Sequence, residues 1–193
     1  ESADINITAQ RIAWGKWMNA GQTCIAPDYI ITSKNMIAPL VAALKSQITK
    51  MFGKDPQQSK SYGRIVNERH AKRISDYLSD LEVEVGGEFS IENRYIAPTI
   101  VLNPPLDSAL MTDEIFGAIL PIIAVEDFDS AKAFVKARDK PLSAYIFSKN
   151  KTQCQSWIDE ISSGSQCIND VIMFNAVPEL PFGGVGPSGM GQY

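Results

Sequence analysis

The stretch ILPIIAVEDFDSAKAFVKARDKPLSAYIFSKNKTQCQSWIDEISSGSQCI, residues 119–168, decides the fold class. Its first seven residues, 119–125, are almost wholly apolar, which predicts a central buried strand despite Pro121. The rest of the stretch alternates predicted helices with predicted strands, over residues 127–137, 142–147, 152–161 and 165–168. Because such alternation is typical of strand–helix units, we expect an α/β fold with a largely parallel sheet flanked by helices.

Outward from this stretch, the first half of the chain also mixes helices and strands. Apolar spacing predicts helices over residues 4–18, 33–52 and 67–79, and strands over residues 29–32, 81–85 and 95–102. Gly53 is the expected end of the second helix, and Pro98 indicates either a sheet edge or a bend. With no internal repeat or linker, the 193 residues predict one domain, residues 1–193.

Composition excludes several classes of protein. A net charge of −4 and a pI near 5.1 give no basic footprint for nucleic acid. No apolar run approaches the roughly 20 residues that span a bilayer, and the mixed polar start does not resemble a signal peptide. Three widely spaced cysteines, no CxxC pair and one histidine argue against a metal site and favour a reducing, cytoplasmic setting.

Cys24 is the first candidate for chemistry. It ends the run NAGQTC, residues 19–24, between a predicted amphipathic helix and a predicted apolar strand. A nucleophilic thiol needs exposure, thiolate character and donors for the oxygen that becomes negative, and a helix-to-strand junction can supply exposure and a backbone N–H. The residues alone leave a second interpretation open, because a free cysteine commonly packs as a small apolar side chain.

Glu114 and Phe116 form the second candidate, just before the buried strand. Glu114 is either a surface carboxylate or, with Phe116, a ligand-facing pair: a carboxylate for a sugar hydroxyl and a ring for a flat heterocycle. His70 could pair with Cys24, but it lies in a charged helix start that favours a solvated or capping role.

The remaining cysteines and the glycine-rich run give weaker indications of a function. Cys154 and Cys167 have apolar neighbours and are expected to be packed. Residues 184–189 fit the spacing G-x-G-x-x-G, yet Pro187 interrupts it, and neither a helix nor an acidic residue follows. We therefore expect these glycines to form a compact turn that uses positive φ angles.

Taken together, the segments at residues 19–24, 114–117 and 180–189 resemble the aldehyde dehydrogenase superfamily. Further segments resemble its class 3 branch: TCIAPDY (23–29), GRIVNERH (63–70), RYIAPT (94–99), SSG (162–164) and NDV (169–171). The resemblance is collinear over nearly the whole chain. It implies a three-layer catalytic domain with Cys24 as nucleophile, and it is the reason to prefer that role.

The resemblance also implies a reaction. In this family a cysteine thiolate attacks the aldehyde, hydride leaves to NAD or NADP, and water hydrolyses the resulting thioester. By position, Glu114 matches the glutamate that bonds the nicotinamide ribose, and Phe116 packs beside the nicotinamide. Phe182 would shape the surroundings of the site. The class 3 branch acts on medium-chain, long-chain and aromatic aldehydes, so a small-molecule aldehyde and a homodimer are the expected partners.

Parts of the family's machinery do not match any residue here. The general-base glutamate, the oxyanion asparagine and the cofactor-binding domain precede the cysteine segment in the family, so we expect a fragment that turns over poorly alone. A membrane-associated setting would require a C-terminal tail that this chain lacks. Ala118 stands where many relatives have proline. Two rival readings stay open: a dehydrogenase that passes its thioester to coenzyme A, and a non-catalytic protein that retains the fold.

Overall fold

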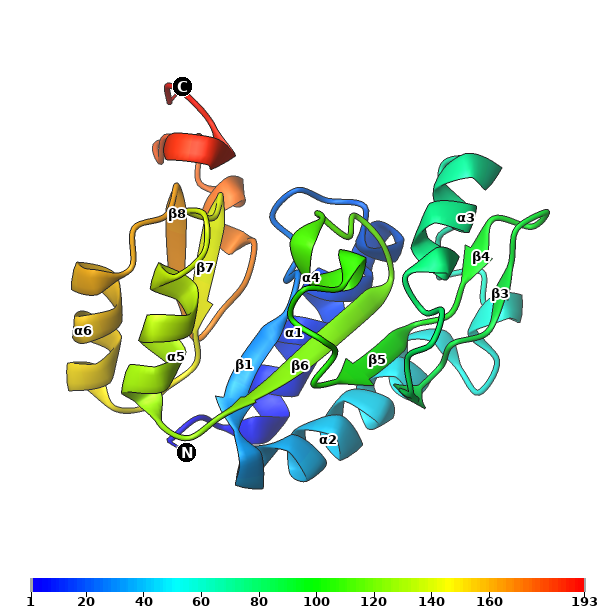
Figure 1. The fold of residues 1–193 in the computed structure, drawn as a ribbon, viewed down its shortest axis with the longest axis horizontal. Coiled ribbons are helices and arrows are strands. Elements are labelled where there is room, and N and C mark those ends of the chain that lie inside the picture. Colours follow the sequence, from blue (N-terminus) through cyan, green and yellow to red (C-terminus); the bar gives the residue numbers. More distant parts are fainter. Residues whose placement is uncertain (1, 193) are drawn as a thin grey trace.

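The computed structural model describes residues 2–192, and its helices and strands follow the apolar pattern of the sequence (Figure 1). The α-helices are α1 (Ile5–Trp17), α2 (Lys34–Phe52), α3 (Glu68–Asp76), α4 (Ala109–Thr112), α5 (Phe128–Lys136) and α6 (Lys151–Glu160). The strands are β1 (Ile30–Ser33), β2 (Val83–Val85), β3 (Phe89–Ser90), β4 (Tyr95–Ile96), β5 (Thr99–Leu102), β6 (Ile119–Val125), β7 (Ser143–Ile146) and β8 (Ser165–Ile168).

The strands form one sheet of order β1-β6-β5-β2 and two separate pairs, β3-β4 and β7-β8. The β1–β6, β5–β6 and β7–β8 pairings are parallel, whereas β2–β5 and β3–β4 are antiparallel. The predicted α/β class with mostly parallel pairing is therefore confirmed. Helices α5 and α6 lie beside β7 and β8 at one end of the molecule, and α3 lies with β3 and β4 at the other (Figure 1).

Strand β6 is the centre of the core, as its apolar run predicts. Ile119, Leu120 and Ile122 are fully buried, and β6 has a parallel neighbour on each side. Pro121 is tolerated because the pairing with β1 begins only at Ile122, so its missing N–H lies outside that ladder. Helix α1 packs along α2, and α2 covers β1 and β6.

Pro98 gives a bend and not a sheet edge. The segment predicted as one strand, residues 95–102, divides into β4 and β5 around Ala97 and Pro98. Strand β5 then lies inside the sheet, between β6 and β2, so the edge interpretation was wrong. Proline has no N–H to donate and a fixed φ, which ends the β4 ladder, while Thr99 resumes pairing one residue later.

Local signals set the helix ends. Asp4 caps α1 by accepting hydrogen bonds from the Asn6 and Ile7 N–H groups, and Asn67 caps α3 at His70 N–H. Gly53 ends α2 with φ +81°, as expected for a residue that must leave the helical conformation.

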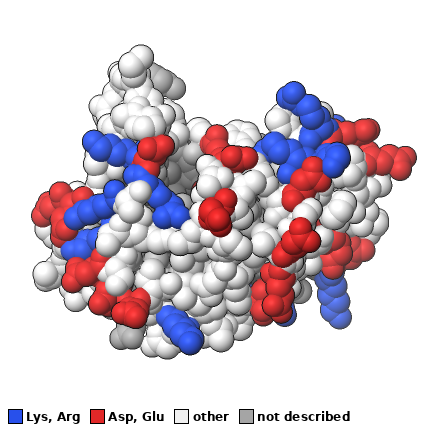
Figure 2. Space-filling model, in the orientation of Figure 1, with Lys and Arg blue, Asp and Glu red and all other residues white. Residues whose placement is uncertain are grey.

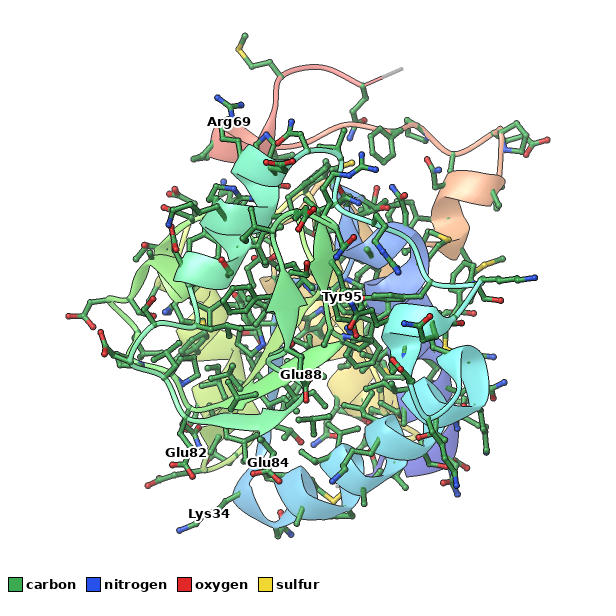
Figure 3. All side chains as sticks on the ribbon, turned by 90° about the vertical axis from the view of Figure 1, so that its right-hand side faces the viewer. Lys34, Arg69, Glu82, Glu84, Glu88 and Tyr95 are labelled. Atoms are coloured by element: carbon green, nitrogen blue, oxygen red, sulfur yellow. The ribbon has the colours of Figure 1, made fainter. Side chains whose placement is uncertain are left out.

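Strand β2 alternates as its sequence predicts. Glu82 and Glu84 lie at the edge of the molecule, turned to solvent (Figure 3), while Val83 and Val85 are half-buried. In the part of the chain from residue 2 to 192, none of the helices combines the length and the apolar character needed for a membrane crossing.

Truncating the core strand tests this arrangement. Ile122→Ala should lower the free energy of unfolding of the intact protein by about 2–5 kcal/mol, because Ile122 is fully buried and the strand has little room to collapse. Ile158→Ala, on α6 with 39% of the residue exposed, is the matched control and should cost less than about 1 kcal/mol. Chemical denaturation measures both; equal losses would contradict the assignment of β6 as the core.

Candidate active site

Cys24 lies in a tight turn that the end of α1 sets up. Asn19, Ala20 and Gly21 follow the helix with φ angles of +52°, +53° and +78°, which reverse the chain direction. The Ala26 N–H then donates to the Thr23 carbonyl oxygen at 2.9 Å and closes a turn around Cys24. Cys24 is exposed, as the sequence interpretation of a presented thiol requires.

The other two cysteines are packed, as predicted. Cys154 is buried, and its thiol points at the Ser148 carbonyl oxygen at 3.6 Å. Cys167 is half-buried on β8, where burial raises the pKa of its thiol. Cys24 is thus the thiol that solvent and ligands reach most easily.

The side chain of Gln22 fixes the turn from the other side. Its amide nitrogen donates to the carbonyl oxygens of Asn19 at 2.9 Å and Arg64 at 3.0 Å, and its amide oxygen accepts from Val66 N–H at 2.9 Å. This amide therefore joins the Cys24 loop to the segment before α3. Sequence reasoning did not assign Gln22 a role, although it stands two residues before the candidate nucleophile.

The Cys24 loop packs directly against the Glu114–Phe116 segment. A Cβ at Gly21 would lie 2.1 Å from the Gly117 carbonyl oxygen, so only glycine permits this contact. The indole N–H of Trp17 donates to the Ala118 carbonyl oxygen at 2.9 Å. Two segments about a hundred residues apart in sequence are thereby held together by one close backbone approach and one side-chain hydrogen bond.

Arg73 on α3 holds the backbone of the Glu114 segment. Its guanidinium donates to the carbonyl oxygens of Glu114 at 3.3 Å and Ile115 at 2.9 Å. It also donates to the Tyr77 hydroxyl at 2.6 Å, which donates in turn to the Asp113 carboxylate at 3.1 Å. The partners of Arg73 in this segment are backbone atoms, which no spacing rule identifies.

The Glu114 and Phe116 side chains remain available. Ile115 between them is fully buried, while Phe116 adopts φ +45° and leaves 40% of its surface exposed. Burial and the charge of Asp28 raise the pKa of Glu114, and Arg73 opposes them. An exposed carboxylate beside an exposed ring fits the ligand-facing pair better than it fits an idle surface acid.

One cleft of about 1420 Å³ brings the three candidates together. Cys24, Glu114 and Phe116 all line it, together with Tyr145 of β7. Figure 2 shows this face hollowed between the part that carries β7 and α5 and the part that carries α4, with acidic and basic side chains interspersed around it. A cleft that joins a thiol, a carboxylate and an exposed ring is a ready site for a small organic ligand.

His70 and Phe182 lie apart from the walls of this cleft. The ring nitrogens of His70 face Arg69 and Arg73 at 3.4 Å each, so the structure does not join it to Cys24 as a dyad. Phe182 reaches the site indirectly: it stacks on Phe174, which stacks on Tyr145.

The glycine-rich run forms a compact turn. Gly186 and Gly189 have φ angles of +59° and +157°, and a Cβ at Gly184 would lie 2.2 Å from the Ser188 carbonyl oxygen. The Ser188 hydroxyl accepts from Val185 N–H at 2.9 Å. The glycines form the compact turn that we expected. Within residues 2–192 they do not precede an α-helix, as the glycines of a dinucleotide-binding site would.

A buried charge lies close behind the nucleophile loop. Lys16 is 1% exposed on the inner face of α1, and burial lowers its pKa to about 8, opposed by Asp28. Burial raises the pKa of Asp28, which also accepts from Ile115 N–H at 3.4 Å. The signal was present in the sequence, since Lys16 follows Ile12 by four residues on the apolar face of the predicted helix.

The Gly21–Gly117 contact is tested by paired glycine substitutions. Gly21→Ala should lower the free energy of unfolding by about 3 kcal/mol or more, because the new Cβ meets a backbone oxygen. Gly53→Ala has the same positive φ but open space around it, and should cost about 1 kcal/mol. Denaturant titration compares the two; a similar loss in both would mean that the loops do not depend on this contact.

Lys16 predicts a pH dependence of stability. Between pH 8 and 10.5 the unfolded chain keeps this lysine protonated while the folded chain does not, so the free energy of unfolding should rise with pH. Lys16→Met should flatten that rise and stabilise the protein at pH 7 by up to about 3 kcal/mol. The exposed Lys45→Met should keep the rise. Denaturation of the wild type, Lys16→Met and Lys45→Met at several pH values tests this. If the free energy of unfolding changed with pH equally in all three proteins, Lys16 would not be a buried charge.

Comparison with known proteins agrees with these features. The model of the aldehyde dehydrogenase family matches residues 1–193. The dimeric NADP-preferring aldehyde dehydrogenase of Rattus norvegicus is 44% identical over 193 residues, which are 100% of this chain and 43% of that protein. Aldehyde dehydrogenase family 3 member A2 of Mus musculus is 46% identical over 190 residues, 98% of this chain and 39% of that protein.

A solved structure matches equally well. The substrate-bound Staphylococcus aureus AldH superimposes with a TM-score of 0.97 at 45% identity, over 100% of this chain and 43% of that chain. This chain thus spans less than half the length of the rat relative and of this structure. The predicted resemblance to class 3 is confirmed by relatives named as family 3 members. The chain belongs to the aldehyde dehydrogenase family.

Proposed function

We propose that the protein carrying this chain oxidises aldehydes to carboxylic acids with NAD or NADP, and that Cys24 is its nucleophile. The observation that carries this proposal is the shared cleft, in which an exposed thiol faces the same space as Glu114 and Phe116. The proposal concerns the protein as a whole, because its rat relative is more than twice as long as this chain.

The Cys24 turn suits attack on a carbonyl carbon. The thiolate adds to the aldehyde and gives a thiohemiacetal whose oxygen is negative. Among residues 2–192 the backbone N–H of Cys24 has no hydrogen-bond partner, so it is free to donate to that oxygen. When bound, NAD or NADP supplies the acceptor for the hydride that leaves the same carbon. The product on Cys24 is a thioester, which water hydrolyses to the acid and the free thiol.

Glu114 and Phe116 fit the cofactor's nicotinamide end. A carboxylate accepts hydrogen bonds from ribose hydroxyls, and an exposed phenyl ring packs against a flat heterocycle. Their backbone is held by Arg73, so both side chains project from a fixed segment. The base for thioester hydrolysis and the second oxyanion donor are expected from residues outside these 193.

The substrate class follows from the relatives. We infer medium-chain, long-chain or aromatic aldehydes, as expected of class 3, and the rat relative's name supports a homodimer and NADP. A Staphylococcus aureus relative, 45% identical over 195 residues, is named 4,4'-diaponeurosporen-aldehyde dehydrogenase, which supports a large apolar substrate. We propose that the protein is located in the cytoplasm.

Replacing the nucleophile tests the proposal. Cys24→Ser should abolish NADH or NADPH formation from hexanal and benzaldehyde, since a hydroxyl is far less ionised than a thiol. Cys167→Ser, at a half-buried position away from the cleft walls, should retain turnover. Alkylation followed by peptide mass should label Cys24 before Cys154 and Cys167. Full turnover by Cys24→Ser, or equal labelling of all three thiols, would overturn the assignment.

A further inference from the structure

Tyr145 connects the β7–β8 pair to the turn that carries Cys24. Its hydroxyl donates to the Ile25 carbonyl oxygen at 2.6 Å, across 120 positions of sequence. The ring is half-buried and lines the same cleft as Cys24. Tyr145 therefore reaches the backbone of the residue that follows the nucleophile, from a separate pair of strands.

The peptide that Tyr145 holds is the one that closes the turn. The Ile25 carbonyl and the Ala26 N–H belong to a single planar peptide unit. Its N–H donates to the Thr23 carbonyl oxygen at 2.9 Å, and its oxygen accepts from Tyr145. With both ends of this plane fixed, the backbone on either side of Cys24 has little freedom to rotate.

The Tyr145 side chain is itself held in place. Its ring stacks on Phe174 with centroids 6.4 Å apart and planes 27° apart, and Phe174 stacks on Phe182 at 6.5 Å and 23°. Burial raises the pKa of Tyr145 to about 12. Because the phenol stays protonated near neutral pH, it remains a donor to Ile25 and does not act as a base.

We propose that Tyr145 is a positioning residue for the nucleophile: its hydroxyl clamps the Ile25–Ala26 peptide and so fixes the direction of the Cys24 side chain in the cleft. The proposal rests on the proposed function only in taking Cys24 as the reacting thiol. Tyr145 transfers no proton and forms no bond to substrate. Its contribution should appear in the rate of attack more than in substrate binding.

The experiment compares two tyrosine hydroxyls in the intact protein. Tyr145→Phe removes the hydroxyl, with its bond to Ile25 and its contacts with Ser143 and the Ile172 backbone, and keeps the stacked ring. Tyr62→Phe is the matched control, because the Tyr62 hydroxyl also donates to a backbone carbonyl, that of Ile96 at 2.8 Å, in the core. Hydrogen exchange is followed at the Ala26 amide and, as a check of the fold, at Leu44 in α2.

We expect the Ala26 amide to exchange about 3- to 10-fold faster in Tyr145→Phe, the size expected for one neutral hydrogen bond. Tyr62→Phe should leave it unchanged, and Leu44 should be equally protected in wild type and Tyr145→Phe. With hexanal, Tyr145→Phe should lower kcat several-fold with KM little changed.

The proposed clamp would be contradicted if the Ala26 amide exchanged at the wild-type rate in Tyr145→Phe. It would also be contradicted if that amide exchanged equally faster in Tyr145→Phe and Tyr62→Phe. A fall in kcat/KM carried by KM alone would also overturn it, since a binding defect is not a positioning defect. Absence of turnover in the wild-type protein would refute the proposed function, while the exchange data would still decide for or against the clamp.

Discussion

The approach of Gly21 to the Gly117 carbonyl oxygen is the constraint on which the candidate site depends. It brings the loop that carries the thiol against the segment that carries Glu114 and Phe116, with no side chain between the two backbones. Gly117 is restricted as well, because a Cβ there would lie 2.6 Å from the Ile74 side chain. The spacing of thiol, carboxylate and ring is thus set by backbone contact, which does not relax as side chains do.

Several strained backbone positions lie near the same cleft. Asn19 and Ala20 before the nucleophile, Phe116 on the cleft wall and Ile172 beside Tyr145 all have positive φ angles without being glycine. Such conformations cost of order 1–3 kcal/mol each and persist only where the surroundings determine them. Here the surroundings are specific: Gln22 and Arg73 bind the backbone with their side chains, and Trp17 adds a buried indole bond.

The cleft also depends on how the β7–β8 pair is attached. Besides Tyr145, Arg11 of α1 bonds to the Asn169 carbonyl oxygen and forms an ion pair with Asp170 at 3.5 Å. The Lys149 N–H donates to the Ser2 carbonyl oxygen at 3.3 Å. These polar links add to apolar contacts, because Tyr145, Phe147 and Cys167 pack against the same core that contains β6. The β7 wall of the cleft is therefore attached to the rest of the chain by both polar and apolar contacts.

The sequence by itself determined helices α1, α2, α3, α5 and α6, the buried strand β6, the parallel α/β class and the three candidate residues, because apolar periodicity and the run around Cys24 are local signals. Tertiary structure alone decided the rest. It split residues 95–102 at Pro98, kept β5 inside the sheet and separated β7–β8 from the main sheet. It also assigned Arg73 and Tyr145 to backbone carbonyls far along the chain. A carbonyl oxygen is common to every residue, so no sequence pattern can show which one a distant side chain will bind.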